Sequence, residues 1–221
     1  EAARDEVALT YFEFGTLAAV DLFRQHDVEI AILEVGLGGR LDAVNAWDAE
    51  VAIVSSVGID HIEWLGSDRE SIGREKAGIY RAQRCAICGD PNPPDSLTQY
   101  AEQVDARLLC VHKDFDFERL PEGWTWRALD KMHAGLPYPA MRGDYQLYNA
   151  ACVLMALDCL AERFPVTMAD IRAGLLNAVL PGRFQTLPGR PVRVLDVAHN
   201  VQAAEALART LRAQVVPGRT I

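Results

Sequence analysis

The chain has few cysteines, and their arrangement argues against both a disulfide scaffold and a zinc site. It contains five cysteines in 221 residues, an odd number at low density, whereas small secreted scaffolds carry an even and dense set. Cys85 and Cys88 form a single C-x-x-C pair, but a zinc ribbon or finger needs a second pair of ligands. We therefore expect reduced structural thiols and a reducing, cytoplasmic environment.

Positive charge and long apolar runs are also scarce. Lys and Arg number 22 against 31 Asp and Glu, which gives a net charge of −9 and a pI near 5.0. This balance argues against a general nucleic-acid surface, although it leaves room for a local basic pocket. No run approaches the roughly 18 apolar residues that a membrane span needs, and we expect no signal peptide. We expect neither nucleic acid nor a membrane as a partner.

Two glycine-rich nucleotide motifs are missing from the sequence. No G-x-x-x-x-G-K-[ST] run, the loop that cradles phosphates in P-loop proteins, occurs in the 221 residues. Gly36, Gly38 and Gly39 superficially resemble a dinucleotide-binding loop. They lack the G-x-G-x-x-G spacing and a clear following helix, so the sequence argues against a nicotinamide site.

What the sequence does contain is an alternation of short apolar runs with helical stretches. Short apolar runs bounded by loops predict buried parallel strands, here at residues 31–36, 51–56, 84–88 and 107–111. Helices are predicted at residues 10–25, 67–78 and 95–104, the first of them opening with the capping pattern Thr10-x-x-Glu13. The alternation predicts an α/β fold with a mostly parallel central sheet flanked by helices.

The pattern changes after Phe115. Residues 115–141 contain three prolines and the alternating segment Trp124-Thr-Trp126, which predict a small antiparallel β subregion. Helices are predicted next, at residues 144–163 and 167–177. A proline- and glycine-rich link then precedes a strand at 192–197 and a helix at 202–211. One strand and one helix cannot form a core, so we interpret this end as the start of a truncated second domain.

Two candidate metal ligands follow the first two predicted strands. Glu34 lies near the end of the first, and His61 follows the second. Ligand sites in open α/β sheets lie beyond the carboxyl ends of the strands, so we expect both side chains in one pocket. The apolar neighbours of Glu34 indicate a buried or half-buried carboxylate, an oxygen ligand of the kind that magnesium prefers. His61 taken alone is more often a structural residue than a ligand.

Several motifs occur in one order along nearly the whole chain. They are Thr10-Tyr-Phe-Glu13, Glu34-Val-Gly-Leu-Gly-Gly-Arg-Leu-Asp-Ala-Val-Asn45, Ser55-Ser-Val-Gly-Ile-Asp-His61, Glu75-Lys-Ala-Gly-Ile79, Asn149-Ala-Ala151, Pro181-Gly-Arg-Phe-Gln185 and Asp196-Val-Ala-His-Asn200. Together they resemble the folylpolyglutamate synthase and dihydrofolate synthase family, which are ATP-dependent amide ligases of the Mur ligase superfamily. Val201 departs from the family pattern, which has a proline there.

The resemblance implies a reaction in which ATP phosphorylates a substrate carboxylate and an amine then displaces the phosphate. The substrates would be dihydropteroate or folates, L-glutamate and ATP, with Mg2+ as cofactor. It assigns the metal to Glu34, His61 and Lys76, with His61 and a carbamylated Lys76 as catalytic residues. By position alone, Lys76 is a cation placed near the C-terminus of a helix. Carbamylation needs a neutral amine, a form that burial favours by lowering the lysine pKa.

The resemblance also implies two groups of substrate-binding residues. The ATP-binding group is Asn149, Arg183, Asp196 and His199, and the pterin-binding group is Thr10, Tyr11, Phe12, Glu13 and Leu41. Thr10 and Glu13 have a second, structural interpretation as a capping box. Arg183 also stands out without the resemblance, because Pro-Gly-Arg fixes a loop cation suited to phosphate.

The resemblance further predicts the domain organisation. Residues 1–187 would form a Mur ligase central domain truncated at its N-terminus. Residues 188–221 would form the beginning of a truncated, Rossmann-like C-terminal glutamate-ligase domain. The family carries its phosphate-binding P-loop before this region, so we expect the 221-residue chain to be inactive by itself, and we expect a monomer. Two alternatives stay open: a non-catalytic α/β binding module that has lost the P-loop, and a peptidoglycan-type Mur ligase.

Overall fold

The computed structural model describes residues 6–214, which contain a three-stranded parallel sheet at their centre. Its strands are hydrogen-bonded in the order β1 (Val51–Val54), β2 (Cys85–Cys88) and β3 (Arg107–Cys110). These strands fall within the runs predicted at residues 51–56, 84–88 and 107–111. The prediction of a parallel sheet is therefore confirmed for these three runs.

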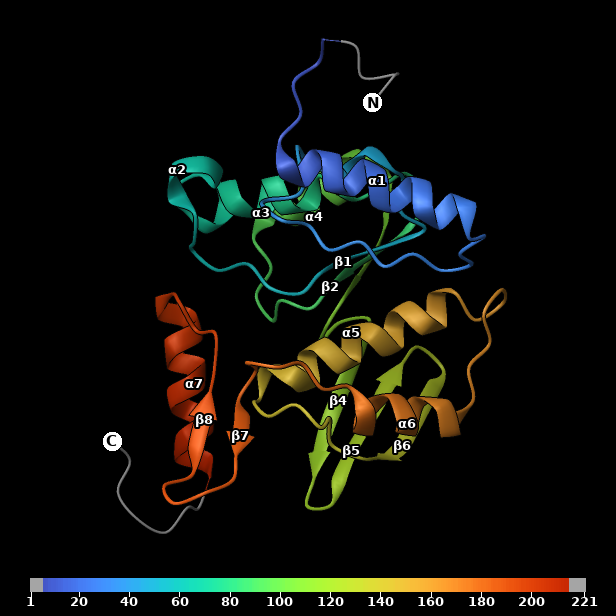
Figure 1. The fold of residues 1–221 in the computed structure, drawn as a ribbon. Coiled ribbons are helices and arrows are strands. Elements are labelled where there is room, and N and C mark those ends of the chain that lie inside the picture. The colour runs from blue at the N-terminus through green and yellow to red at the C-terminus, as the bar shows by residue number, and fades with distance from the viewer. Residues whose placement is uncertain (1–5, 215–221) are drawn as a thin grey trace.

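Helices cover both faces of this sheet (Figure 1). α3 (Arg69–Ala77) and α4 (Asp95–Gln103) pack on one face, and α5 (Tyr145–Cys159) packs on the other. Successive side chains of a strand point to opposite faces. In β2, Cys88 accordingly joins the core with α3 and α4, while Ile87 joins the core with α5, and neither side chain is exposed. A strand buried on both sides explains why the sequence shows a continuous apolar run there.

A separate antiparallel sheet packs against α5, as predicted for residues 115–141. Its strands are β4 (Phe115–Leu120), β5 (Gly123–Ala128) and β6 (Lys131–Leu136). Trp124 and Trp126 lie two residues apart in β5, so both point to the same face, where both are fully buried. α6 (Met168–Asn177) packs on the same core. The predicted α/β class with a small antiparallel subregion is confirmed.

The C-terminal part is a hairpin followed by a helix. β7 (Gln185–Leu187) pairs antiparallel with β8 (Arg193–Leu195), and α7 (Val201–Ala213) follows. The domain boundary predicted between residues 187 and 188 falls inside this hairpin. Because β7 is hydrogen-bonded to β8, the structural unit that contains α7 begins no later than Gln185.

The N-terminal part contains one confirmed helix and one strand prediction that was wrong. α1 (Tyr11–Gln25) begins at Thr10, whose hydroxyl accepts from Glu13 N while the Glu13 carboxylate accepts from Thr10 N, so the capping box is confirmed. Residues 31–36 form no strand, and Ile32 is 90% exposed. None of the described strands pairs with this run, and an extended segment without a partner forms no hydrogen-bond ladder.

Two short helical turns complete the described elements. η1 (Ala43–Ala46) follows the glycine-rich loop, and α2 (Ile62–Leu65) follows β1. None of the helices in residues 6–214 is long and apolar enough to cross a membrane.

Candidate functional site

The loop of residues 36–45 is folded around the carboxylate of Asp42. One Asp42 oxygen accepts from Gly36 N and Leu37 N, both at 3.0 Å, and the other accepts from Val44 N at 3.0 Å. Gly38 has a φ of +71°, a left-handed conformation that glycine adopts without steric cost. The glycine-rich motif thus builds a compact loop. Its backbone N–H groups donate to the Asp42 carboxylate, whereas those of a nucleotide-binding loop donate to phosphate.

This loop packs closely against the C-terminal end of α3. Arg40 N donates to Glu75 O at 2.9 Å, and the Arg40 guanidinium pairs with the Glu75 carboxylate at 3.0 Å. A Cβ atom added to Gly39 would lie 2.9 Å from Glu75 O and 3.0 Å from Lys76 O. Only glycine permits this approach, which holds the loop against the helical turn that carries Lys76.

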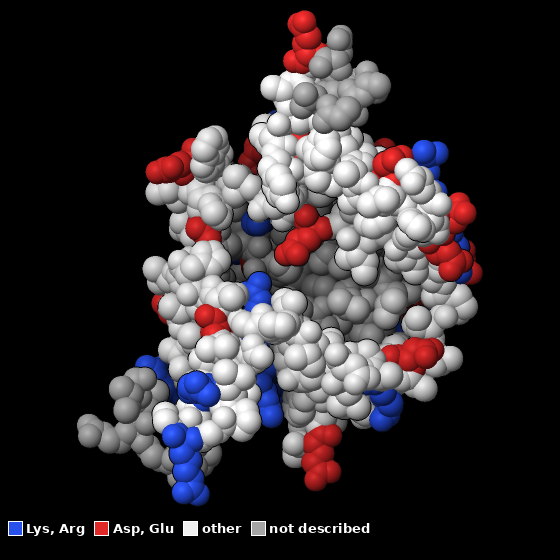
Figure 2. All heavy atoms as spheres, in the orientation of Figure 1, with Lys and Arg blue, Asp and Glu red and all other residues white. Residues whose placement is uncertain are grey.

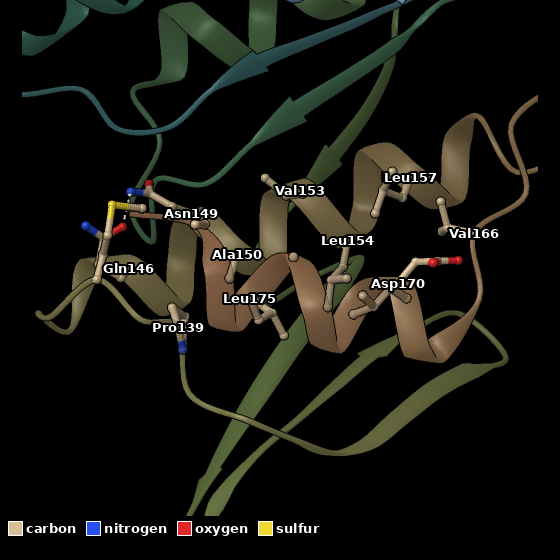
Figure 3. A pocket seen from close by; sticks show the side chains of 14 residues that line it. Pro139, Gln146, Asn149, Ala150, Val153, Leu154, Leu157, Val166, Asp170 and Leu175 are labelled. Carbon is tan, nitrogen blue, oxygen red and sulfur yellow. Dashed lines mark hydrogen bonds between the residues drawn. The ribbon is translucent and has the colours of Figure 1, made fainter. Parts of the chain in front are cut away.

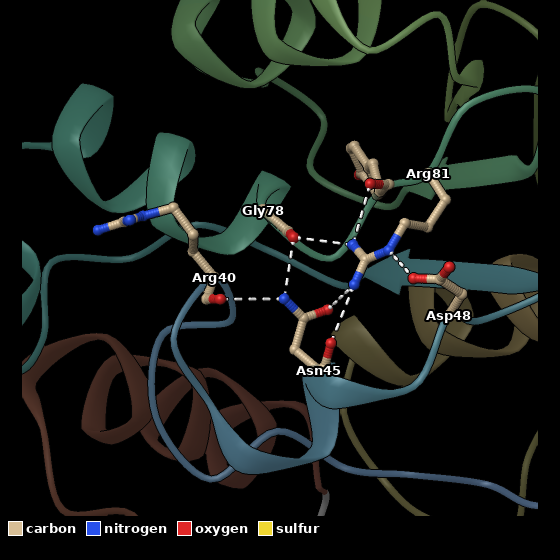
Figure 4. Close-up of polar contacts among 6 residues, drawn as sticks. Arg40, Asn45, Asp48, Gly78 and Arg81 are labelled. Atoms are coloured by element: carbon tan, nitrogen blue, oxygen red, sulfur yellow. Dashed lines mark hydrogen bonds and ion pairs between the residues drawn. The ribbon is translucent and has the colours of Figure 1, made fainter.

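Arg81 and Asn45 fix the other side of the same loop (Figure 4). The Arg81 guanidinium donates to Asn45 Oδ1 at 2.8 Å, to Asn45 O at 3.0 Å and to Gly78 O at 3.1 Å, and it also pairs with Asp48. Asn45 Nδ2 donates to Arg40 O at 3.0 Å and to Gly78 O at 3.1 Å. These bonds tie the loop to the residues that follow α3, so they position the last turn of that helix.

Replacing Arg81 by alanine is expected to lower the free energy of unfolding by about 1.5–3 kcal/mol, because several charge-assisted hydrogen bonds are lost together. The matched control is Arg84→Ala, since Arg84 is exposed and only three residues away. Its expected effect is within about 0.5 kcal/mol. Urea denaturation of both variants measures the difference, and equal midpoints would contradict the positioning role of Arg81.

Lys76 is half-buried in the last turn of α3, the helix that was predicted at residues 67–78. Burial lowers the pKa of the Lys76 ammonium, and the nearby Asp60 carboxylate opposes that shift. A lowered pKa increases the fraction of neutral amine, the form that can react with carbon dioxide. The environment of Lys76 therefore suits the predicted modification.

His61 lies just beyond the carboxyl end of β1, in the loop that leads to α2. It adopts a left-handed conformation with φ 50° and ψ 42°, which is uncommon for a residue with a side chain. Asp90, at the carboxyl end of β2, accepts from Val57 N at 2.7 Å and from Arg69 Nη2 at 2.9 Å, and so holds the same loop. His61 thus lies in the loop between β1 and α2, and its role as a metal ligand stays a prediction.

Glu34 does not lie at the end of a strand, and the expectation that it is buried was wrong. Its run has no strand partner, and its side chain is exposed. It lines a groove of about 300 Å3 between α1 and residues 32–34, together with Tyr11 and Phe12. The groove therefore brings one predicted metal ligand together with two predicted pterin contacts.

The other predicted pterin contacts are arranged differently. Thr10 and Glu13 bond to each other in the capping box, which lowers the pKa of the Glu13 carboxyl through hydrogen bonds from the backbone and side chain of Thr10. Leu41 is 78% exposed on the glycine-rich loop. None of these three residues lines the groove.

No group of three or more His, Cys, Asp or Glu side chains within residues 6–214 is close enough to hold a metal ion. The predicted set of Glu34, His61 and Lys76 includes a lysine, which supplies an oxygen ligand only after carbamylation. The assignment of these three residues to one metal therefore stays a prediction.

Three of the four predicted ATP-binding residues lie close together in sequence and structure. Asp196 accepts from Phe184 N at 2.8 Å and from Ala198 N at 2.9 Å, so its carboxylate joins the loop of Arg183 to the segment of His199. Arg183 is exposed. His199 is exposed as well, and its Nδ1 lies 2.9 Å from Val197 O.

Asn149 lies apart from this group, on α5. Its Nδ2 donates to Gln146 Oε1 at 3.2 Å, and both residues line one end of a cavity of about 300 Å3 between α5 and α6 (Figure 3). The remaining lining is mostly apolar and includes Val153, Leu154 and Leu157. None of the recorded hydrogen bonds within residues 6–214 joins Asn149 to Arg183, Asp196 or His199.

The face shown in Figure 2 is hollowed between the part of the molecule that contains α1 to α4 and the part that contains α5 to α7. Acidic and basic side chains both border this hollow.

Sequence reasoning missed four residues that organise the site: Asp42, Asn45, Arg81 and Asp90. Asp42 had a detectable signal, because an aspartate directly before a helical turn is a common N-cap. Arg81 and Asp90 had none, since their partners are 36 and 33 residues away in sequence.

The chain is similar to known proteins over its entire length. It is 43% identical over 221 residues to the dihydrofolate synthase/folylpolyglutamate synthase of Escherichia coli strain K12, an alignment that covers 100% of this chain and 51% of that protein. It is 31% identical over 226 residues to the Mycobacterium tuberculosis protein of the same name, with coverages of 95% and 46%. The chain thus spans about half the length of these curated relatives. No protein-family model matches it.

Solved structures show the same similarity. The fold matches Escherichia coli FolC in complex with DHPP and ADP with a TM-score of 0.93 at 43% identity, over 99% of this chain and 51% of that one. It matches the bifunctional folylpolyglutamate synthase/dihydrofolate synthase of Yersinia pestis complexed with AMPPNP and Mn ion with a TM-score of 0.88 at 44% identity, over 96% and 50%.

Proposed function

Because this chain belongs to the dihydrofolate synthase/folylpolyglutamate synthase family, as its motifs predicted, we propose that the protein containing it is an ATP-dependent carbon–nitrogen ligase. It adds L-glutamate to dihydropteroate, to folates, or to both, through an acyl phosphate. The observation that carries this proposal is the 43% identity that extends over the entire chain.

ATP and a divalent cation, Mg2+, are the proposed co-substrate and cofactor. Support comes from relatives whose structures contain ADP, or AMPPNP with Mn ion. Arg183, Asp196 and His199 form the proposed nucleotide contact at the start of the C-terminal unit, and Asn149 contributes from α5. Arg183 is exposed, which suits a cation that meets phosphate.

The proposed ligands of Mg2+ are Glu34, His61 and carbamylated Lys76. Glu34 and the carbamate would supply the oxygen atoms that this cation prefers. Glu34 offers exposed carboxylate oxygens, and the lowered pKa of Lys76 favours the neutral amine that carbamylation requires. When bound, the cation would neutralise negative charge on the phosphates. The protein's own part is to keep the Lys76 amine half-buried and to hold His61 at the sheet edge.

The groove between α1 and residues 32–34 is the proposed pterin site. Tyr11 and Phe12 place two aromatic side chains along it, and aromatic rings stack favourably on a flat heterocycle. Leu41 would contact the substrate from the glycine-rich loop. Thr10 and Glu13 form hydrogen bonds with each other. Their role is therefore to fix the start of α1 and, with it, the two aromatic residues.

The 221-residue chain by itself is proposed to be inactive, because it contains no P-loop motif. Without donors that hold the phosphates in line, transition-state stabilisation falls by several kcal/mol, and each ~1.36 kcal/mol is tenfold in rate. Turnover of ATP by the purified chain would contradict this expectation.

The remaining properties are proposed on narrower support. The protein is a cytoplasmic monomer that takes small-molecule substrates, and its five free thiols agree with a reducing compartment. Its chain divides into a central domain and the start of a C-terminal glutamate-ligase domain. The pairing of β7 with β8 favours a division before Gln185 rather than after residue 187.

The experiment that tests the proposal is glutamate addition by the complete gene product. Purified protein is incubated with ATP, Mg2+ and labelled L-glutamate, with dihydropteroate and tetrahydrofolate supplied in separate reactions. We expect ATP-dependent incorporation with at least one of the two. Binding of pteroate without incorporation would favour a non-catalytic module, and incorporation of an amino acid only into a nucleotide-linked muramyl substrate would favour a peptidoglycan ligase.

A further inference from the structure

One hydrogen bond joins the first turn of α7 to the loop that carries His61. Asn200 is the N-cap of α7, and its Oδ1 accepts from Ala203 N at 2.8 Å. Its Nδ2 donates to Asp60 Oδ2 at 2.7 Å, across 140 residues of sequence. Asn200 therefore uses one end of its amide to cap the helix and the other to bind the β1–α2 loop.

Asp60 is bonded on its other side to the backbone of His61. Asp60 Oδ1 accepts from His61 N at 2.8 Å, and the Asp60 pKa is lowered first by the hydrogen bond from Asn200 and then by that from His61. His61 itself has a left-handed backbone. Residues in such conformations persist where the surroundings hold them, and the Asp60 carboxylate is one of the groups that hold His61.

The same two segments are also in close steric contact. A Cβ atom added to Gly58 would lie 1.8 Å from Oε1 of Gln202, the second residue of α7. Within residues 6–214, the bond between Asn200 and Asp60 is the only recorded hydrogen bond between residues 185–214 and any residue before 180. The position of α7 relative to the sheet edge thus depends on a small contact centred on Asp60.

We propose that Asp60 and Asn200 are positioning residues: their bond docks the α7 unit on the β1–α2 loop and thereby fixes His61 at the carboxyl edge of the sheet. Through this bond, a shift of α7 and of the neighbouring His199 would change the position of His61, the predicted metal ligand. The effect on catalysis rests on the proposed ligase function, whereas the docking of α7 does not.

A charge swap in the complete protein tests the proposal. Asn200→Asp keeps an acceptor for Ala203 N and so preserves the helix cap, but it places a carboxylate against the Asp60 carboxylate. In the double variant Asp60→Asn/Asn200→Asp, the amide stands on the β1–α2 loop and the carboxylate on α7. All three hydrogen bonds can then form again with the roles of the central pair reversed. Asn177→Asp, at an exposed site at the end of α6, controls for the added charge.

The first readout is hydrogen–deuterium exchange of residues 58–66 and 200–206, which requires no activity. We expect exchange in both segments to rise by about 10- to 100-fold in Asn200→Asp, the range that corresponds to loss of a charge-assisted hydrogen bond. The double variant should return to within about threefold of the wild type. Unchanged exchange in Asn200→Asp, or no recovery in the double variant, would overturn the docking role.

The second readout is kcat for glutamate addition, which separates positioning of His61 from simple docking. We expect kcat to fall by about 10- to 100-fold in Asn200→Asp and to recover in the double variant. Exchange that responds while kcat does not would overturn the effect on His61. A wild-type protein without ligase activity would overturn the proposed function, and the exchange experiment would still decide the docking role.

Discussion

Replacing Lys76 by alanine in the complete protein is expected to lower glutamate ligation by at least about 10²–10³-fold, the loss seen when one preorganised electrostatic group is removed. Stability should change little, because alanine favours a helix and a helix-end lysine contributes only about 0.3–1 kcal/mol. The reason for the large effect on activity is the proposed carbamate, which alanine at position 76 cannot form because it has no side-chain amine. Initial rates at saturating substrates measure the change.

Two further variants separate the carbamate from the positive charge. Lys76→Arg keeps the charge but cannot form the carbamate, so it should be as inactive as Lys76→Ala. Lys113→Ala removes an exposed lysine and should leave activity unchanged. Short carboxylic acids are expected to restore part of the activity of Lys76→Ala by replacing the lost oxygens. Full activity of either Lys76 variant would rule out the modification as a requirement.

Replacing Gly39 by alanine is expected to lower the free energy of unfolding by about 1–3 kcal/mol, because the added methyl group overpacks a close contact. The new Cβ would lie 2.9 Å from Glu75 O and 3.0 Å from Ile79 Cγ2, and the backbone carbonyl cannot move without disturbing α3. The turn displaced would be the one that carries Lys76, so kcat should fall as well, by about tenfold or more.

Gly174→Ala is the matched control for this change. Gly174 lies inside α6, and an added Cβ would meet no heavy atom within 4 Å. Alanine there should stabilise the protein by about 0.5–1 kcal/mol through its helix propensity, and activity should not change. Urea denaturation and kcat are measured on both variants. The close contact of the loop with α3 would be refuted if Gly39→Ala behaved like Gly174→Ala.

Much of the fold could be predicted because its signals are local. The three apolar runs that became β1, β2 and β3 contribute side chains to the cores on both faces of the sheet, so composition alone revealed them. The capping box of Thr10 and Glu13 lies within four residues and was recognisable for the same reason. The last turn of α3, with Lys76 in it, followed from the helix predicted to end at Gly78.

The wrong prediction at residues 31–36 shows the limit of local signals. An apolar run indicates what could be buried, but a strand forms only where another strand offers its hydrogen-bonding edge. No described strand does so here, and Ile32 and Glu34 are exposed as a result. The sequence of the run contains no information about that partner.

The hydrogen bonds that hold the site together were less predictable from the sequence than the residues proposed for it. Arg81 bonds to Asn45, Asp90 holds the loop before His61, and Asp60 meets Asn200 across 140 residues. Each pair consists of ordinary polar residues whose separation in sequence has no characteristic spacing. Their pairing follows from the tertiary fold, which a single sequence does not specify at that level.

The most direct test of the proposed chemistry follows an oxygen atom. The complete protein is supplied with ATP, L-glutamate and dihydropteroate or folate labelled with 18O in the carboxylate that reacts. In a reaction through an acyl phosphate, that oxygen bonds to the γ-phosphorus and leaves with it when the amine attacks. We expect the label in inorganic phosphate, detected by the isotope shift in 31P NMR, in proportion to the amide formed. Label in AMP, or amide formation with unlabelled phosphate, would contradict the proposed mechanism.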